Sequence, residues 1–324
     1  MVEILANIGE VGEFPASLSV SPGRGVESIA LHWKRTRSIW EYLIEKWVLI
    51  NGIACILLVA LIFLFLLREG LSVFKSSSLR DFLLGQYWYP VSDPPRFGIL
   101  PLILGSLLVT AGAILISIPL GIGAAIFISE IAPGGIRDWI KSGVELLAAI
   151  PSIVIGFIGM VVLAPFLKDL FSLPTGLTAL TGSVTLAFMA MPTIVSITED
   201  ALTAVPRAHR EASLALGATH WQTIYRVVVP SAASGILAAI MLGVGRAIGE
   251  TMAVMMVTGN AAVIPHTFLQ PVRTLTATIA AEMGETVHQS PHYFALFAIG
   301  IVLFVITFFI NMGAGFVIQR QKRS

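Results

Sequence analysis

Long apolar runs without charges are the feature that most limits how this 324-residue sequence can fold. A helix needs about 20 apolar residues to cross a hydrocarbon layer roughly 30 Å thick. Lipid offers no hydrogen bonds to the backbone, and this favours helices, whose backbone groups pair within one segment. The runs predict an all-α integral membrane protein with a six-helix transmembrane bundle, spanning at residues 47–67, 98–129, 146–167, 176–198, 227–258 and 293–318.

Composition and charge argue against several other classes of protein. Hydrophobic residues make up 56% of the chain and charged residues 12%, whereas an ordinary soluble domain has about 25% charged residues. The net charge of +1 lacks the basic surplus that duplex nucleic acid binding needs, so we expect no nucleic-acid partner. The six histidines are scattered without HExxH spacing and there is one cysteine, so we expect no metal site.

The distribution of basic residues predicts the orientation and the division of the chain. Thirteen Lys and Arg fall in the loops of one side and six in those of the other, which places both termini in the cytoplasm. We divide the chain into a mobile tail with an interfacial helix (1–46), an anchor (47–67), an extracytoplasmic loop (68–97), a core (98–318) and a basic tail (319–324).

A polar stretch at residues 199–230 separates the fourth and fifth spans. Pro206 can open a helix and Gly217 can end one, so the stretch predicts two short helices that meet at Gly217. We expect Arg207, Arg210 and Glu211 to be available on the outside of the first. Such a loop suits either docking into another protein or resting on the membrane surface, and the pattern alone leaves both open.

The fifth span contains the only full charges within the predicted spans. Arg246 and Glu250 are four residues apart, so on one helix they would share a face and could pair. Because intramembrane charges usually face a bundle interior or a water-filled path, Arg246 is a candidate for binding an oxyanion. A purely structural ion pair is the alternative. Thr251 could add a hydroxyl to an anion path or bond to its own backbone.

Small residues and prolines mark further candidate positions. Gly245 and Gly249 have the GxxxG spacing that lets a neighbouring helix approach closely. Pro151, followed by Ser152, removes a backbone hydrogen bond from the third span, which predicts a kink that could flex in gating. In the last outer loop, Glu282 and Glu285 could contact a binding protein, but we expect them to belong to a solvated loop face.

The 199–230 stretch resembles the EAA motif of binding-protein-dependent ABC importer permeases. That motif reads EAA, three residues, G, nine residues, I, one residue, LP, and the corresponding positions here are Glu211, Ala212, Ser213, Gly217, Val227, Val229 and Pro230. Ser213 replaces the third motif residue, and two valines replace Ile and Leu. The resemblance implies type I ABC importer architecture with a cytoplasmic coupling-helix loop, in which Glu211, Ala212 and Gly217 contact an ATPase subunit.

Three further segments narrow the resemblance to the PstC family of phosphate-importer permeases. They are residues 144–160, 242–260 and 301–310, of which GRAIGETMAV is the most specific part. The resemblance implies a multi-pass subunit in a bacterial or archaeal cytoplasmic membrane that forms half of an ATP-driven phosphate path, with Arg246 and Glu250 associated with translocation. It implies a PstA-like permease partner, two PstB-like ATPase subunits that use ATP and Mg²⁺, and a PstS-like binding protein, besides phosphate and membrane lipids.

The chain's own residues leave two alternatives to phosphate import. The sequence has no GxxxxGK[ST] loop, so we expect no ATPase site and no cofactor bound by this chain. A permease for another oxyanion, such as sulfate or molybdate, fits an intramembrane arginine equally well. A membrane enzyme acting on a lipid phosphate fits less well, because no nucleophile or metal cluster accompanies Arg246 and Glu250.

Overall fold

The computed structural model describes residues 24–75 and 77–321. The predicted tail at 1–23 and the last three residues of the predicted basic tail lie outside this range. The chain forms two compact units, Met1–Ile62 and Phe63–Ser324, which are treated separately below.

Helix α2 (Arg24–Gly70) begins in the first unit and ends in the second. It runs without a break past residue 46, where the sequence placed the end of an interfacial helix. Its part in the first unit exposes large apolar side chains, among them Ile56 and Leu58, which are 72% and 60% exposed. Such an apolar surface suits contact with lipid.

The all-α membrane prediction is confirmed by helix length and composition. In the described part of the chain, five helical segments can cross a membrane: Trp40–Lys75, Leu100–Ile131, Ser152–Leu170, Ala179–Thr203 and Pro291–Gly313. A sixth exists if two helices that meet at 69°, His220–Ser231 and Ala233–Gly249, form one bent span.

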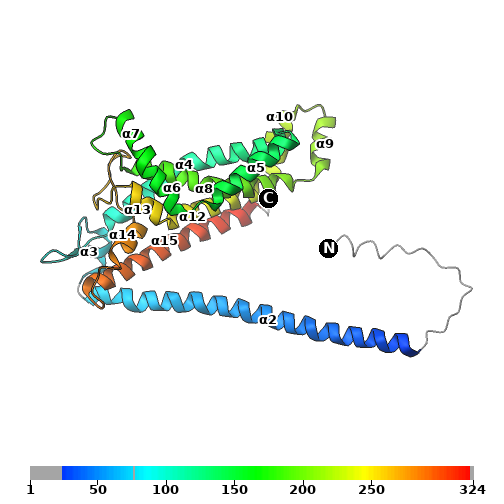
Figure 1. The fold of residues 1–324 in the computed structure, drawn as a ribbon, viewed down its shortest axis with the longest axis horizontal. Coiled ribbons are helices and arrows are strands. Elements are labelled where there is room, and N and C mark those ends of the chain that lie inside the picture. Colours follow the sequence, from blue (N-terminus) through cyan, green and yellow to red (C-terminus); the bar gives the residue numbers. More distant parts are fainter. Residues whose placement is uncertain (1–23, 76, 322–324) are drawn as a thin grey trace, which may run out of the picture. The chain divides into compact units, whose positions relative to one another are not determined.

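The second unit is built mainly from helices (Figure 1). The first part comprises η1 (Leu71–Lys75), α3 (Leu79–Leu84), α4 (Leu100–Ile126), η2 (Phe127–Ile131), α5 (Gly134–Ala149), α6 (Ser152–Ile158), η3 (Gly159–Leu163), α7 (Ala164–Leu170) and α8 (Ala179–Thr203). The second part comprises α9 (Arg207–Ala215), α10 (His220–Thr223), η4 (Ile224–Val228), α11 (Val229–Ser231), α12 (Ala233–Gly249), α13 (Met252–Val257), α14 (Leu275–Glu282) and α15 (Pro291–Gln321). Strands β1 (Trp88–Tyr89) and β2 (Arg96–Phe97) pair antiparallel, with Trp88 opposite Phe97.

Helix α8 is the centre of the second unit and packs most extensively against α4 and α12. Ile194 of α8 fills the space beside two glycines: a Cβ atom at Gly121 of α4 or Gly243 of α12 would lie 2.8 or 2.6 Å from its side chain. Close packing of small residues therefore holds the three helices together. Figure 1 shows α9 and α10 at one end of this bundle and α3, α7 and α14 toward the other.

Two predicted spans have wrong boundaries. The third begins at Ser152 rather than near residue 146, because α5 ends at Ala149 and Pro151 precedes the first turn of α6. The fifth does not continue to residue 258. Its helix α12 ends at Gly249, and Glu250 adopts an extended conformation with φ −68° and ψ 133° before α13 begins.

Candidate functional site

The loop between α8 and α12 has the two predicted short helices. Pro206 directly precedes α9, and Gly217 follows it with φ +83°, a left-handed conformation that glycine adopts without steric penalty. Thr219 then caps α10, since its hydroxyl accepts from the backbone N–H of Gln222 and the Gln222 side chain accepts from the N–H of Thr219. The prediction of two helices meeting at Gly217 is confirmed.

The loop exposes all three residues assigned to coupling: Glu211, Ala212 and Gly217. Leu216 beside them is 90% exposed and presents an apolar side chain at the surface of the loop. A groove of about 450 Å³ adjoins them, lined by His209, Ala212, Ser213, Leu216, Ala218, Gln222, Arg226 and Val227. The arrangement offers an apolar knob and an adjacent hollow to another molecule.

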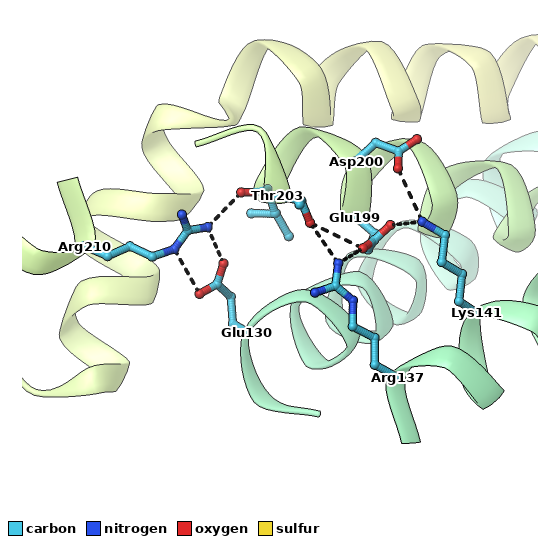
Figure 2. A network of polar contacts seen from close by, with 8 residues as sticks. Glu130, Arg137, Lys141, Glu199, Asp200, Thr203 and Arg210 are labelled. Atoms are coloured by element: carbon cyan, nitrogen blue, oxygen red, sulfur yellow. Dashed lines mark hydrogen bonds and ion pairs between the residues drawn. The ribbon is translucent and has the colours of Figure 1, made fainter. Parts of the chain in front are cut away.

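Arg210 does not extend outward from the loop as expected. Its guanidinium binds both carboxylate oxygens of Glu130 on η2, at 2.7 and 3.4 Å, in the pairing drawn in Figure 2. It also donates to the backbone oxygens of Leu202 and Val205, at 2.9 and 2.5 Å. Only 7% of the Glu130 side chain is exposed, so a buried carboxylate draws Arg210 inward.

A second polar centre lies next to the first at the end of α8. Glu199, with 3% of its side chain exposed, accepts from Arg137 at 2.5 Å and from Lys141 at 2.8 Å. Both cations come from α5, and Figure 2 shows them converging on the carboxylate. The hydrogen bond to Glu199 raises the pKa of Lys141 above its ordinary value. Two buried carboxylates thus connect η2, α5, α8 and α9.

Arg246 and Glu250 do not form the predicted i, i+4 pair, because the helix ends between them. Within the described residues, the one hydrogen bond of the Arg246 side chain is donated to Thr193 Oγ1 on α8, at 3.3 Å. Glu250 instead accepts from the backbone N–H of Ala253 in the first turn of α13, at 3.3 Å. Arg246 is exposed on the surface of this single chain, so its guanidinium remains accessible.

The break at Glu250 and Thr251 follows from a weak helix former and from a contact with α14. Gly249 is a weak helix former, and Thr276 of α14 donates its hydroxyl to the Glu250 carbonyl oxygen, which an unbroken helix would have used internally. Thr251 donates its hydroxyl to the Gly249 carbonyl at 3.2 Å. Its hydroxyl hydrogen is therefore used by the backbone, while its oxygen can still accept.

The other predicted positions have mixed outcomes. A Cβ atom at Gly245 or Gly249 would meet no atom of the described chain within 4 Å, so no helix of the described chain approaches this pair closely. Pro151 and Ser152 lie where α5 gives way to α6, which is a break between two helices rather than a kink within one. A gating role for them stays a prediction.

The expectation of a solvated Glu282 is wrong. Only 17% of its side chain is exposed, and its carboxylate accepts from Arg273 at 2.5 Å and from the Trp88 indole at 3.1 Å. His292 Nε2 lies 2.8 Å from the second oxygen. This cluster ties the β1 segment to α14 and to the start of α15, so it has a structural role at the end of the bundle opposite α9.

The sequence carried signals for the contacts that we missed. Glu130 and Glu199 each lie at the end of an apolar span, where a carboxylate that becomes buried needs a cation. Arg137 and Lys141 are four residues apart and so share one face of α5. The partners themselves are 58 to 80 residues apart, and no local pattern pairs them.

A bundle of helices long and apolar enough to cross a membrane, with an exposed helical loop at one end, has the architecture of a multi-pass membrane protein. The family description "Binding-protein-dependent transport system inner membrane component" matches residues 117–323, more than half of the chain. The chain belongs to this family of ABC transporter permeases.

Curated relatives and solved structures agree with that assignment. The chain is 41% identical over 261 residues to the Bacillus subtilis protein named "Probable ABC transporter permease protein YqgH", covering 80% of this chain and 84% of that protein. It is also 41% identical to the phosphate transport system permease protein PstC of Mesorhizobium japonicum, covering 78% and 81%. The predicted resemblance to PstC proteins is confirmed.

The fold itself matches an ABC importer. A chain of a bacterial alginate ABC transporter, solved in complex with its pentasaccharide-bound periplasmic protein, superposes with a TM-score of 0.60. The match covers 87% of this chain and 97% of that one at 18% identity, which shows a shared fold. The type I importer architecture implied by the EAA motif is confirmed.

Proposed function

We propose that this chain is a transmembrane subunit of an ATP-driven importer of inorganic phosphate and forms half of its translocation path. The observation that carries the proposal is the 41% identity to a phosphate transport permease over 78% of the chain. A related PstA-like permease supplies the other half, and a PstS-like binding protein delivers phosphate from outside. Both termini and the α9–α10 loop are then cytoplasmic, as the basic residues favour.

Arg246 is the residue that meets phosphate in this proposal. It lies on an apolar helix, three residues before a helix break, and its guanidinium is held by a neutral hydroxyl rather than by a carboxylate. An arginine without a carboxylate partner keeps donors free for a bidentate bond to a passing oxyanion. The Glu250 carboxylate accepts from a backbone N–H and does not pair with Arg246. It is close enough in sequence to offset the positive charge of Arg246 when no phosphate is bound.

The α9–α10 loop docks on an ATPase subunit in the same proposal. Its exposed Leu216 and the adjacent groove suit a protein surface better than water. The complex would contain two PstB-like ATPase subunits, which bind ATP and Mg²⁺ in their own sites. In Glu211→Arg, a reversed charge on the exposed face should reduce recovery of the ATPase subunit with tagged permease. Recovery equal to wild type would remove the docking assignment.

Uptake of labelled phosphate tests the path directly. Vesicles containing the whole complex are supplied with ATP, and wild type is compared with Arg246→Gln. Hydrogen bonds to charged groups contribute about 1.5–3 kcal/mol, so uptake should fall by about tenfold or more in an assembled complex. Arg68→Gln, which removes a charge at the end of α2, is the matched control and should transport as wild type does.

Each outcome bears on a different part of the proposal. If wild type transports phosphate and Arg246→Gln does so equally well, Arg246 has no role in the path. If the assembled wild-type complex moves no phosphate, the assignment of phosphate as substrate is wrong.

A further inference from the structure

Helix α9 packs beside α10 and η4 within its own loop, and its side chains reach η2 and α8 through polar contacts. No residue of α9 is buried, so apolar packing contributes little to its position. Arg210 makes four hydrogen bonds to groups outside α9: two to Glu130, one to the backbone oxygen of Leu202 in α8 and one to that of Val205 just after α8. Ser213 adds one hydroxyl contact to Thr223 at 3.0 Å.

The partners of Arg210 belong to two core spans. Glu130 lies in η2, which directly continues α4, and Leu202 lies in the last turn of α8. Helices α4 and α8 pack along each other through the core of the second unit. A guanidinium suits this position, because its three nitrogens can donate to a carboxylate and to two carbonyl oxygens at once. The donors of a lysine all lie on one nitrogen and cannot cover the same set of acceptors.

The neighbouring contacts of Glu199 tie the end of α8 to α5, so that the two helix ends move together. Arg137 and Lys141 fix α5 to Glu199, and Arg137 also donates to Thr203, one turn further along α8. The ends of α4, α5 and α8 therefore form one polar assembly with α9, as Figure 2 shows. A displacement of α9 is passed to this assembly through Arg210.

We propose that Arg210 is a positioning residue for energy coupling: its bond to Glu130 joins the docking loop to the ends of the spans that line the path. The inference rests on the proposed function, in which α9 contacts an ATPase. Without this bond, closure of the ATPase subunits moves α9 without moving α4 and α8. ATP is then hydrolysed with little transport.

The test measures two quantities in the complete complex, namely phosphate moved per ATP hydrolysed and the amide hydrogen exchange of α9. The variants are Arg210→Gln, Glu130→Gln and the double variant. Asp138→Asn is the matched control, since Asp138 is an exposed carboxylate eight residues after Glu130, with no bond to any other described residue. Only 7% of the Glu130 side chain is exposed, so its replacement leaves the exposed side chains of α9 unchanged.

We expect each single variant to lower the transport ratio by about tenfold and to speed exchange in α9 by a similar factor, with the ATPase subunit still recovered. Because both replacements break the same bond, the double variant should be no worse than Arg210→Gln. Asp138→Asn should match wild type in both measurements.

Three results would overturn the proposal. A wild-type ratio in Arg210→Gln removes the coupling role, even if exchange in α9 is faster. Additive losses in the double variant show that Arg210 and Glu130 act separately. Unchanged exchange shows that Arg210 does not hold α9. If the wild-type complex moves no phosphate, the substrate assignment fails, while the exchange measurement still decides whether Arg210 fixes the helix.

Discussion

Glu199→Gln should destabilise the protein more than any replacement of a nearby surface carboxylate. Glu199 is 3% exposed in its side chain and accepts charged hydrogen bonds from Arg137 at 2.5 Å and Lys141 at 2.8 Å. A glutamine amide can accept from one cation but turns its own N–H groups toward the other. Each bond of this kind contributes about 1.5–3 kcal/mol.

The two cations moderate the loss because they are partly in contact with solvent. Their side chains are 32% and 40% exposed, so water can replace some of the missing interaction. We therefore expect a destabilisation of about 2 kcal/mol, below the 3–5 kcal/mol typical of breaking a fully buried pair. At about 2–4 °C per kcal/mol, the apparent melting temperature should fall by about 4–8 °C.

The assay is size-exclusion chromatography of the fluorescently tagged complex after heating to a series of temperatures. Asp200→Asn is the matched control: it removes the same charge from the next residue, whose side chain is 72% exposed and lies 3.6 Å from Lys141. We expect a shift of about 1 °C or less there, as for exposed pairs. Equal shifts in the two variants would refute the reasoning from burial.

Three other replacements test the packing, the turn and the path. Gly243→Ala should destabilise the protein by about 1–3 kcal/mol, because its Cβ atom would lie 2.6 Å from a side chain of α8. Gly245→Ala is the control, since a Cβ atom there has no such contact within the described chain. Thermal unfolding of the two variants gives the comparison. Gly217→Val places a β-branched residue at φ +83° and should cost about 1–2 kcal/mol, seen as lower recovery of the ATPase subunit. Thr193→Val should raise the KM for phosphate uptake by leaving Arg246 without its hydroxyl, and Thr193→Ser should restore it.

Helix content and loop structure could be predicted because they depend on local chemistry. Apolar runs of sufficient length specify membrane helices, and Pro206 and Gly217 specify where a short helix begins and ends, whatever lies nearby. The EAA spacing identified the family from a few positions in the same loop. These features need no knowledge of distant residues.

The contacts that position the site could not be predicted, since they depend on tertiary structure. Treating the run from 227 to 258 as one helix placed Arg246 beside Glu250, yet the hydroxyl of Thr276, 26 residues further on, helps to hold the break between them. In the same way, Arg210 appeared solvent-facing by helical spacing, and only the burial of Glu130, 80 residues earlier, turned it inward.

Anion selectivity is the most direct test of the central claim, because an arginine recognises anionic oxygens without fixing the central atom. The measurement is ATP-dependent uptake of labelled phosphate by the wild-type complex with its binding protein, challenged in turn by a large excess of unlabelled sulfate and molybdate. A phosphate importer should accumulate phosphate at the same rate with either competitor present. Abolition of uptake by sulfate or molybdate, together with ATP-driven accumulation of that anion, would contradict the account and assign the path to a different oxyanion.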